Sequence, residues 1–219
     1  MSPRRSDALS RDRIVDATVR ILDQEGADGL TVRAVTARLS TGRGAIYHHV
    51  RGKDDLLAAA ADGVVDRALA GLADGDDAER AIRAVALAVF DAIDAHPWLG
   101  TQLAREPAQP AALRIWKALG VRLRQLGLTG TALPSAGSAL VNYVLGAAAQ
   151  HAAGARRAPD DATRRAHLEE LAAQWVQHDD DPVVREAAGL LRDHDDREQF
   201  LAGVDIFLTG AREHRGHRA

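Results

Sequence analysis

The chain has 219 residues, of which 46% are hydrophobic and only 4% aromatic, and its formal net charge is −3. Much of the apolar material is alanine, which favours closely packed helices over strands. The absence of cysteine excludes disulfides, thiolate catalysis and cysteine-ligated zinc. The first residues lack a signal peptide's apolar segment, and the most apolar stretch, 136–149, is too short to span a bilayer, so we expect a cytoplasmic protein.

The charge is unevenly distributed along the chain. Residues 1–53 carry ten Lys/Arg and six Asp/Glu, whereas residues 54–219 carry 18 and 25. A basic N-terminal part followed by an acidic remainder indicates that only the N-terminal part binds a polyanion.

Three helices are predicted in the basic head. Apolar residues recur at helical spacing in 11–25, between Ser10 as N-cap and Gly26 as a stop. A short helix is predicted at 32–39, with Thr31 as its N-cap, and a second short helix at 43–50. Between them lies the tight break Ser40-Thr41-Gly42.

The rest of the chain is predicted to be helical too. One long helix follows Gly52 and reaches residue 72, and the segment ADGDD at 73–77 is the best domain boundary. Further helices are predicted at 77–95, 98–105, 108–127, 133–156, 160–178, 183–192 and 195–212. The predicted fold is therefore all-α. It has an N-terminal three-helix domain at 1–53, a linking helix at 54–72, and a C-terminal antiparallel helical bundle at 73–219.

Several kinds of binding site could explain the unusual stretch STGRGAIYHHVRGKDDL at 40–56. Neither a dinucleotide fingerprint nor a phosphate loop fits, because Tyr47 stands where each needs a glycine. Adjacent histidines on a helix point about 100° apart, so they do not easily share one metal ion. The acidic runs 178–181 and 194–196 are a better metal candidate, against the simpler interpretation of solvated loops and helix starts. We find no nucleophile–base motif and expect no enzyme and no cofactor.

A helix-turn-helix accounts for this stretch better. The second helix of such a motif lies in the major groove, where an arginine such as Arg43 can pair with guanine. Gly44 and Ala45 allow the backbone to approach the bases, and Tyr47 and His48 can donate to phosphates. Lys53 lies at the start of the next helix, a further anion-binding geometry. Arg4 and Arg5 are candidates for an additional DNA contact.

Residues 10–57 resemble the N-terminal domain of the tetracycline-repressor (TetR) family. The matching pieces are IVDATVRILDQEGADGLTVRAVTARL and GRGAIYHHVRGKDDLL, whereas the family's usual Gly-Val-Ser turn is Ser40-Thr41-Gly42 here. By position, the family's phosphate-contacting residues correspond to Thr31, Tyr47, His49 and Lys53. The positions that face the major groove correspond to Arg33, Arg43, Gly44, Ala45 and His48.

The C-terminal part resembles the tetracycline-repressor-like branch through HPWLGTQLAREP and EQFLAGVDIFLTGAR. The resemblance implies a homodimer that binds double-stranded operator DNA, and a C-terminal domain that binds a small molecule. The Ala/Gly-rich helix 133–156 and the apolar helix 195–212 agree with a four-helix dimer interface, although both could instead form the domain's own core.

A mostly apolar ligand pocket is predicted inside the C-terminal bundle. The argument is scarcity, because all three tryptophans and one of two tyrosines lie there, and because Asn142, Tyr143 and His96 place polar groups in or beside apolar helices. The candidate wall residues are Phe90, His96, Trp98, Leu103, Trp116, Leu119, Asn142, Tyr143 and Trp175. We therefore expect a ligand-responsive repressor; a DNA-binding protein without a small-molecule ligand is the alternative.

Overall fold

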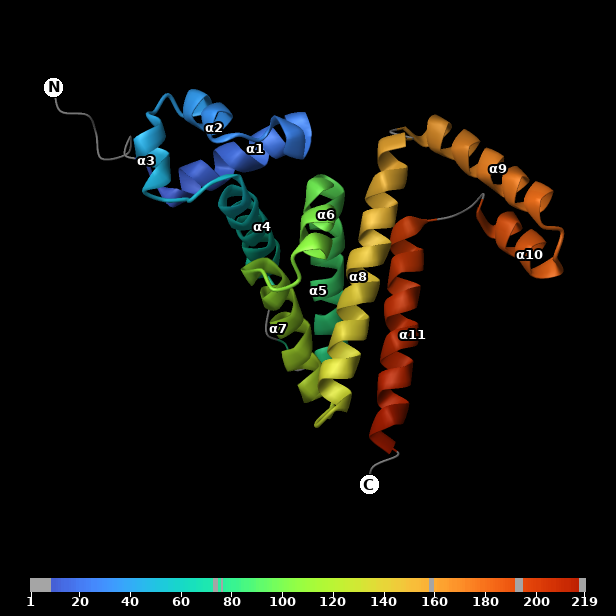
Figure 1. Cartoon of the computed structure of the whole chain (residues 1–219). Coiled ribbons are helices and arrows are strands. Elements are labelled where there is room, and N and C mark those ends of the chain that lie inside the picture. Colours follow the sequence, from blue (N-terminus) through green and yellow to red (C-terminus); the bar gives the residue numbers. More distant parts are fainter. Residues whose placement is uncertain (1–8, 73–74, 76, 158–159, 192–194, 217–219) are drawn as a thin grey trace.

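The computed structural model describes residues 9–72, 75, 77–157, 160–191 and 195–216, and these are helical apart from their turns (Figure 1). The N-terminal helices are α1 (Arg11–Gly29), α2 (Val32–Arg38) and α3 (Arg43–Tyr47), and the long helix α4 (Lys53–Ala70) leads into the rest of the chain. The bundle consists of α5 (Ala78–Ala95), α6 (Trp98–Arg105), α7 (Pro110–Gln125), α8 (Ala132–Arg157) and α11 (Asp196–Gly216). The two remaining helices are α9 (Asp161–His178) and α10 (Pro182–Leu190). The all-α prediction is confirmed.

Local signals fix the ends of the first two helices. The Ser10 hydroxyl accepts a hydrogen bond from the N–H of Arg13 at 3.3 Å, and Thr31 caps α2 through the N–H of Ala34 at 3.0 Å. Gly26 has φ 70° and ψ −172°, so it breaks α1 where the sequence predicted. The residues after it, up to Gly29, form one more helical turn before α2.

The turn and the second short helix differ in detail from the prediction. Ser40 has φ 50°, the left-handed region in which glycine is favoured, so a serine bears the strain at this turn. Helix α3 ends at Tyr47 rather than Val50, because the chain tightens there: the N–H of His49 donates to the carbonyl of Ile46, three residues back, at 2.9 Å.

One continuous apolar core joins the N-terminal helices to the bundle. Ile14, Leu30 and Ile46 are at most 1% exposed and hold α1–α3 together. Helix α4 packs against α1 on one side and α5 and α7 on the other. Through α4, the position of the short helices depends on the bundle below them (Figure 1).

Helices α8 and α11 run antiparallel, side by side, and α9 and α10 pack on each other beyond them (Figure 1). On α11, Phe200, Val204 and Leu208 are buried within the chain's own bundle, whereas Ile206 is 75% exposed. Within Ala132–Arg156 of α8 an 18-residue window has a mean hydropathy of 1.2, so by length and composition alone this helix could cross a membrane. From the sequence, the most apolar stretch, 136–149, was expected to be too short to span a bilayer. Helix α8 instead packs on α5, α6, α7 and α11.

Candidate DNA-binding surface and effector cavity

Helices α2 and α3 present an exposed polar face on two buried anchors. Val35 on α2 and Ile46 on α3 are both 0% exposed, so each short helix is held by a core contact rather than by its own length. Burying a side chain of this size contributes roughly 1.5–3 kcal/mol. Of the nine predicted DNA contacts from Thr31 to Lys53, eight are exposed and Ala45 is half-buried. The exposed ones are Thr31, Arg33, Arg43, Gly44, Tyr47, His48, His49 and Lys53.

Tyr47 decides between two interpretations of this face. Packed into the small core it would only stabilise the fold, but it is 54% exposed. Gly44 has nothing within 4 Å of where a Cβ would lie, so the backbone of α3 is open to close approach. A helix in the major groove needs a basic side chain in its first turn, small side chains where its backbone approaches the bases, and donors to phosphates. The arrangement provides all three.

The start of α4 has mixed electrostatics. Gly52 caps it without a side-chain hydrogen bond, and Lys53 is its exposed first residue. Asp54 and Asp55 also lie in this first turn, and Asp55 accepts a hydrogen bond from the N–H of Arg51 at 2.9 Å. The two carboxylates offset the positive end of the helix, so Lys53 itself is the part of this turn suited to a phosphate.

A cavity of about 590 Å³ lies between α6, α7 and α8, and we call it the α6–α8 cavity. Leu103, Trp116 and Asn142 of the predicted wall line it, together with small residues such as Gly100 and Ala104. Its volume lies within the range of about 300–1,000 Å³ typical of small-molecule sites.

The other predicted wall residues lie elsewhere. Phe90 and Tyr143 line a second cavity under α9, described below, and Leu119 is fully buried in the core. Trp175 lies on α9 and is 41% exposed. His96 and Trp98 lie at the junction of the bundle with α1. The nine residues therefore do not form one wall, because scarcity of a residue type says where large side chains are and not which way they point.

Two of the three helices that wall the α6–α8 cavity, α6 and α7, are attached to the N-terminal part of the chain. At the start of α6, the Trp98 indole donates to Asp23 Oδ1 on α1 at 2.8 Å, and His96 Nδ1 lies 2.8 Å from the same oxygen. On α7, the Arg114 guanidinium contacts Asp62 and Asp66 on α4, at 3.0 Å each. Arg114 is the immediate neighbour of Leu113, which lines the cavity. A shift of α6 would therefore move α1, and a shift of α7 would move α4.

The acidic runs at 178–181 and 194–196 cap helices and form ion pairs, and Asp196 contacts Arg164 on α9. Asp181 caps α10 and Asp195 caps α11 through backbone N–H groups, and Asp180 pairs with Arg185 at 2.8 Å. Among the described residues no group of three or more His, Asp or Glu side chains is placed to hold a metal ion. His194, like Arg4 and Arg5, lies outside the described residues.

Comparison with known proteins gives two family matches that together span most of the chain. Residues 14–60 match the family described as bacterial regulatory proteins, tetR family, and residues 72–215 match the tetracyclin repressor-like C-terminal domain. The HTH-type transcriptional repressor DrrR1 of Streptomyces coeruleorubidus is 38% identical over 64% of this chain, and the match spans 53% of that protein's length. An HTH-type transcriptional regulator of Saccharopolyspora erythraea is 31% identical over 78% of this chain and 72% of that protein.

Solved structures agree with the fold. SCO7222, a TetR transcriptional regulator from Streptomyces coelicolor, superposes with a TM-score of 0.83 at 45% identity, over 94% of this chain and 99% of that one. ActR from the same organism, solved in complex with actinorhodin, gives a TM-score of 0.76 at 24% identity over 96% of this chain and all of that one.

Proposed function

Because the chain belongs to the TetR family of bacterial transcriptional regulators, we propose that it is a cytoplasmic, homodimeric repressor that leaves its operator when a small molecule binds. The operator is a pseudo-palindromic double-stranded DNA site, because a two-fold symmetric dimer presents two identical reading heads. The exposed face of α2 and α3, held by buried Val35 and Ile46, is the observation that carries this proposal.

On this proposal the residues of the face divide by role. Arg33, Arg43, Gly44, Ala45 and His48 meet base edges, and Thr31, Tyr47, His49 and Lys53 meet phosphates. The division follows the positions of the family resemblance. Chemistry agrees where a guanidinium can pair with a base edge, as for Arg33 and Arg43, and where a hydroxyl or ammonium group can donate to a phosphate, as for Thr31, Tyr47 and Lys53, whereas the two histidines are divided by position alone.

The dimer is proposed to form through α8 and α11. Only 28% of the most apolar 18-residue stretch of α8 is buried inside one chain. Much of the apolar surface of this helix is therefore left for another chain to cover. A groove between α8 and α11 lies beside it, lined by Ala139, Ile206, Phe207 and Gly210 among others. The same groove on a second copy completes a four-helix interface. Val204 is buried in its own bundle, so Ile206 is the position at which a charge would break the dimer without opening the core.

The effector is proposed to be a mostly apolar small molecule in the α6–α8 cavity. Binding there acts on α6 and α7, and both are attached to the DNA-binding part, through Asp23 and through Arg114. The ligand favours a state in which the two recognition helices are no longer one DNA turn apart, roughly 34–36 Å. ActR, which has the same fold, was solved with a bound small molecule, which supports a ligand in a domain of this shape.

Operator selection from random DNA with the full chain tests the first half of the proposal. The enriched sites are expected to be two-fold symmetric, and Ile206→Glu should lose both the dimer in sedimentation and the selected site. Asymmetric enriched sites, or an intact Ile206→Glu dimer, would contradict it.

An effector screen tests the second half, with tryptophan fluorescence and DNA release read together. A true effector should release DNA from the wild type but not from Ala104→Phe, which fills the α6–α8 cavity. Arg114→Ala should still bind that effector and release less DNA. If compounds that bind the cavity leave operator affinity unchanged, the chain is a DNA-binding protein without a small-molecule switch.

A further inference from the structure

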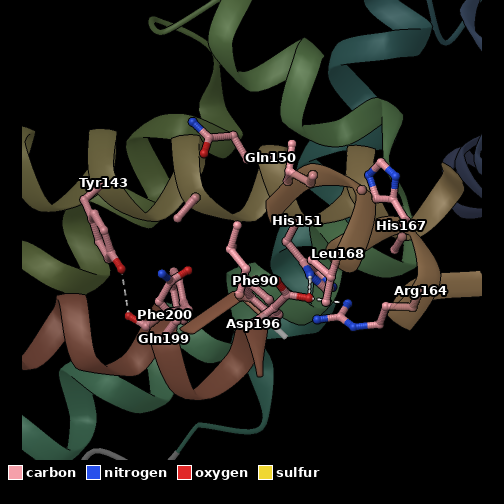
Figure 2. A pocket seen from close by; sticks show the side chains of 15 residues that line it. Phe90, Tyr143, Gln150, His151, Arg164, His167, Leu168, Asp196, Gln199 and Phe200 are labelled. Atoms are coloured by element: carbon pink, nitrogen blue, oxygen red, sulfur yellow. Dashed lines mark hydrogen bonds and ion pairs between the residues drawn. The ribbon is translucent and has the colours of Figure 1, made fainter. Parts of the chain in front are cut away.

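A second cavity, of about 300 Å³, lies between α5, α8, α9 and α11, and we call it the α9 cavity (Figure 2). It shares no lining residue with the α6–α8 cavity. Small residues on α8, among them Ala147 and Gly154, open it from one side, and Leu168 and Leu171 of α9 cover it. A Cβ on Gly154 would meet nothing within 4 Å. Larger side chains at positions 147 and 154 would fill this space.

Aromatic rings form one side of the α9 cavity in an unbroken row. His151 stacks on Phe90 with ring centroids 4.8 Å apart, Phe90 lies 4.6 Å from Phe200, and Phe200 stacks on Tyr143 at 5.8 Å. The Tyr143 hydroxyl donates to the carbonyl of Phe200 at 2.9 Å, and burial raises the pKa of this phenol, so it stays a donor. Such a wall favours a flat aromatic molecule, because contacts between aromatic rings add binding energy to that of the buried apolar area.

Among the described residues, the one guanidinium and the one carboxylate that line the α9 cavity are paired with each other. Arg164 of α9 lies 2.5 Å from Asp196 of α11. His151 Nδ1 is 2.8 Å from the same carboxylate and His151 Nε2 is 3.0 Å from Asp94. The Nδ1 contact is a close approach rather than an aligned hydrogen bond, since this atom has no partner by hydrogen-bond geometry. A ligand with a net charge would enter without a free counter-charge and would lose its hydration, which is costly in a part-buried site.

Three polar side chains at the α9 cavity make no hydrogen bond within the described part of the chain. Gln150 and Gln199 lie at its exposed edge and His167 is half-buried, so all three can turn their polar atoms to a bound molecule in place of solvent. Each amide, and a neutral imidazole, offers both a donor and an acceptor. Together with the aromatic row and the paired charges, they lead us to propose that the α9 cavity is a second small-molecule site, specific for uncharged aromatic compounds that carry hydroxyl or carbonyl groups.

Three probes of one size test this on the full chain by calorimetry: 1,5-dihydroxynaphthalene, naphthalene-1-sulfonate and 1-naphthylmethylamine. The neutral diol is expected to bind at least about tenfold more tightly than the anion or the cation. Gly154→Leu should reduce diol affinity at least tenfold, because it fills the cavity. Gln150→Leu and His167→Leu should each reduce it roughly two- to tenfold, the worth of one neutral hydrogen bond.

Ala104→Phe is the matched control, because it fills the other cavity and should leave diol binding unchanged. The proposal is overturned if the charged probes bind equally well, if the wild type does not bind the diol, or if Ala104→Phe rather than Gly154→Leu removes binding. Should Gly154→Leu fail to fold, unchanged diol affinity in both Gln150→Leu and His167→Leu would overturn it. DNA binding without any probe is measured in parallel; its failure in the wild type would count against the proposed function and not against this site.

Discussion

Replacing Gly203 with alanine tests the contact between α8 and α11 that positions both the aromatic row and the proposed dimer face. A Cβ at Gly203 would lie 1.9 Å from the Tyr143 hydroxyl oxygen and 2.3 Å from the ring carbon that bears it. No atoms in a folded protein approach so closely without a bond, so Tyr143 must move. It would then lose its hydrogen bond to Phe200 and the stacked contact at 5.8 Å.

The magnitude follows from these losses. A neutral hydrogen bond contributes about 0.5–1.5 kcal/mol and an aromatic pair a similar amount, while overpacking costs about 1–3 kcal/mol. Alanine recovers roughly 1 kcal/mol in helix propensity. We therefore expect Gly203→Ala to lower the free energy of unfolding by about 1–5 kcal/mol, a fall in Tm of about 2–4 °C for each kcal/mol in a chain of this size.

Urea unfolding followed by circular dichroism is the assay, at one protein concentration because a dimer's stability depends on it. Gly154→Ala is the control: it also replaces a glycine inside a helix, but its Cβ meets open space, so it should be neutral or stabilise by up to about 1 kcal/mol. Adding Tyr143→Ala to Gly203→Ala should remove most of the clash. A Gly203→Ala chain as stable as Gly154→Ala would refute the packing of Tyr143 on α11.

Three further outcomes are expected. Arg43→Ala should weaken the operator complex by about 1–3 kcal/mol and relax base preference at one position per half-site, without loss of folding, because the side chain is exposed; unchanged selection profiles would contradict this. Lys53→Ala should weaken all DNA sequences alike and lower the salt slope by about one unit, measured by anisotropy across ionic strengths. The hydrogen bonds from Arg212 hold the pKa of Glu79 below its ordinary value of 4.5, so this pair stabilises the fold above that pH and the contribution is lost as the pH falls through the folded-state pKa. Wild type and Glu79→Gln should therefore differ in Tm at pH 7 and converge in acid.

The helices were largely predictable from sequence because each carries its own local signals. Ser10, Thr31 and Gly26 set boundaries through caps and a left-handed residue, and these are properties of single residues and their neighbours. The end of α3 was less predictable, since the tightening after Tyr47 depends on how Ile46 is held in the core. The exposure of one face of α2 and α3 was predictable for the same local reason: apolar spacing on two short helices determines which side chains remain outside.

The cavities could not be predicted in this way. Leu119 and Trp175 were equally good candidates by composition, yet one is in the core and the other faces solvent, because their directions depend on the crossing of distant helices. His151, Arg164 and Asp196 meet from three helices, and their meeting depends on how α8, α9 and α11 cross. The polar pair Gln150-His151 within the Ala-rich helix α8 offered a hint.

The division between anchor and reading face on α3 has an evolutionary consequence. Ile46 is fully buried and Val50 is 5% exposed, whereas Arg43, Gly44 and Tyr47 are exposed. Surface substitutions of this kind usually change stability by no more than about 0.5 kcal/mol. Mutations that retarget the helix to a new operator are therefore nearly free of a folding penalty. A lineage carrying this scaffold can diverge in the genes it controls while selection on its core stays the same.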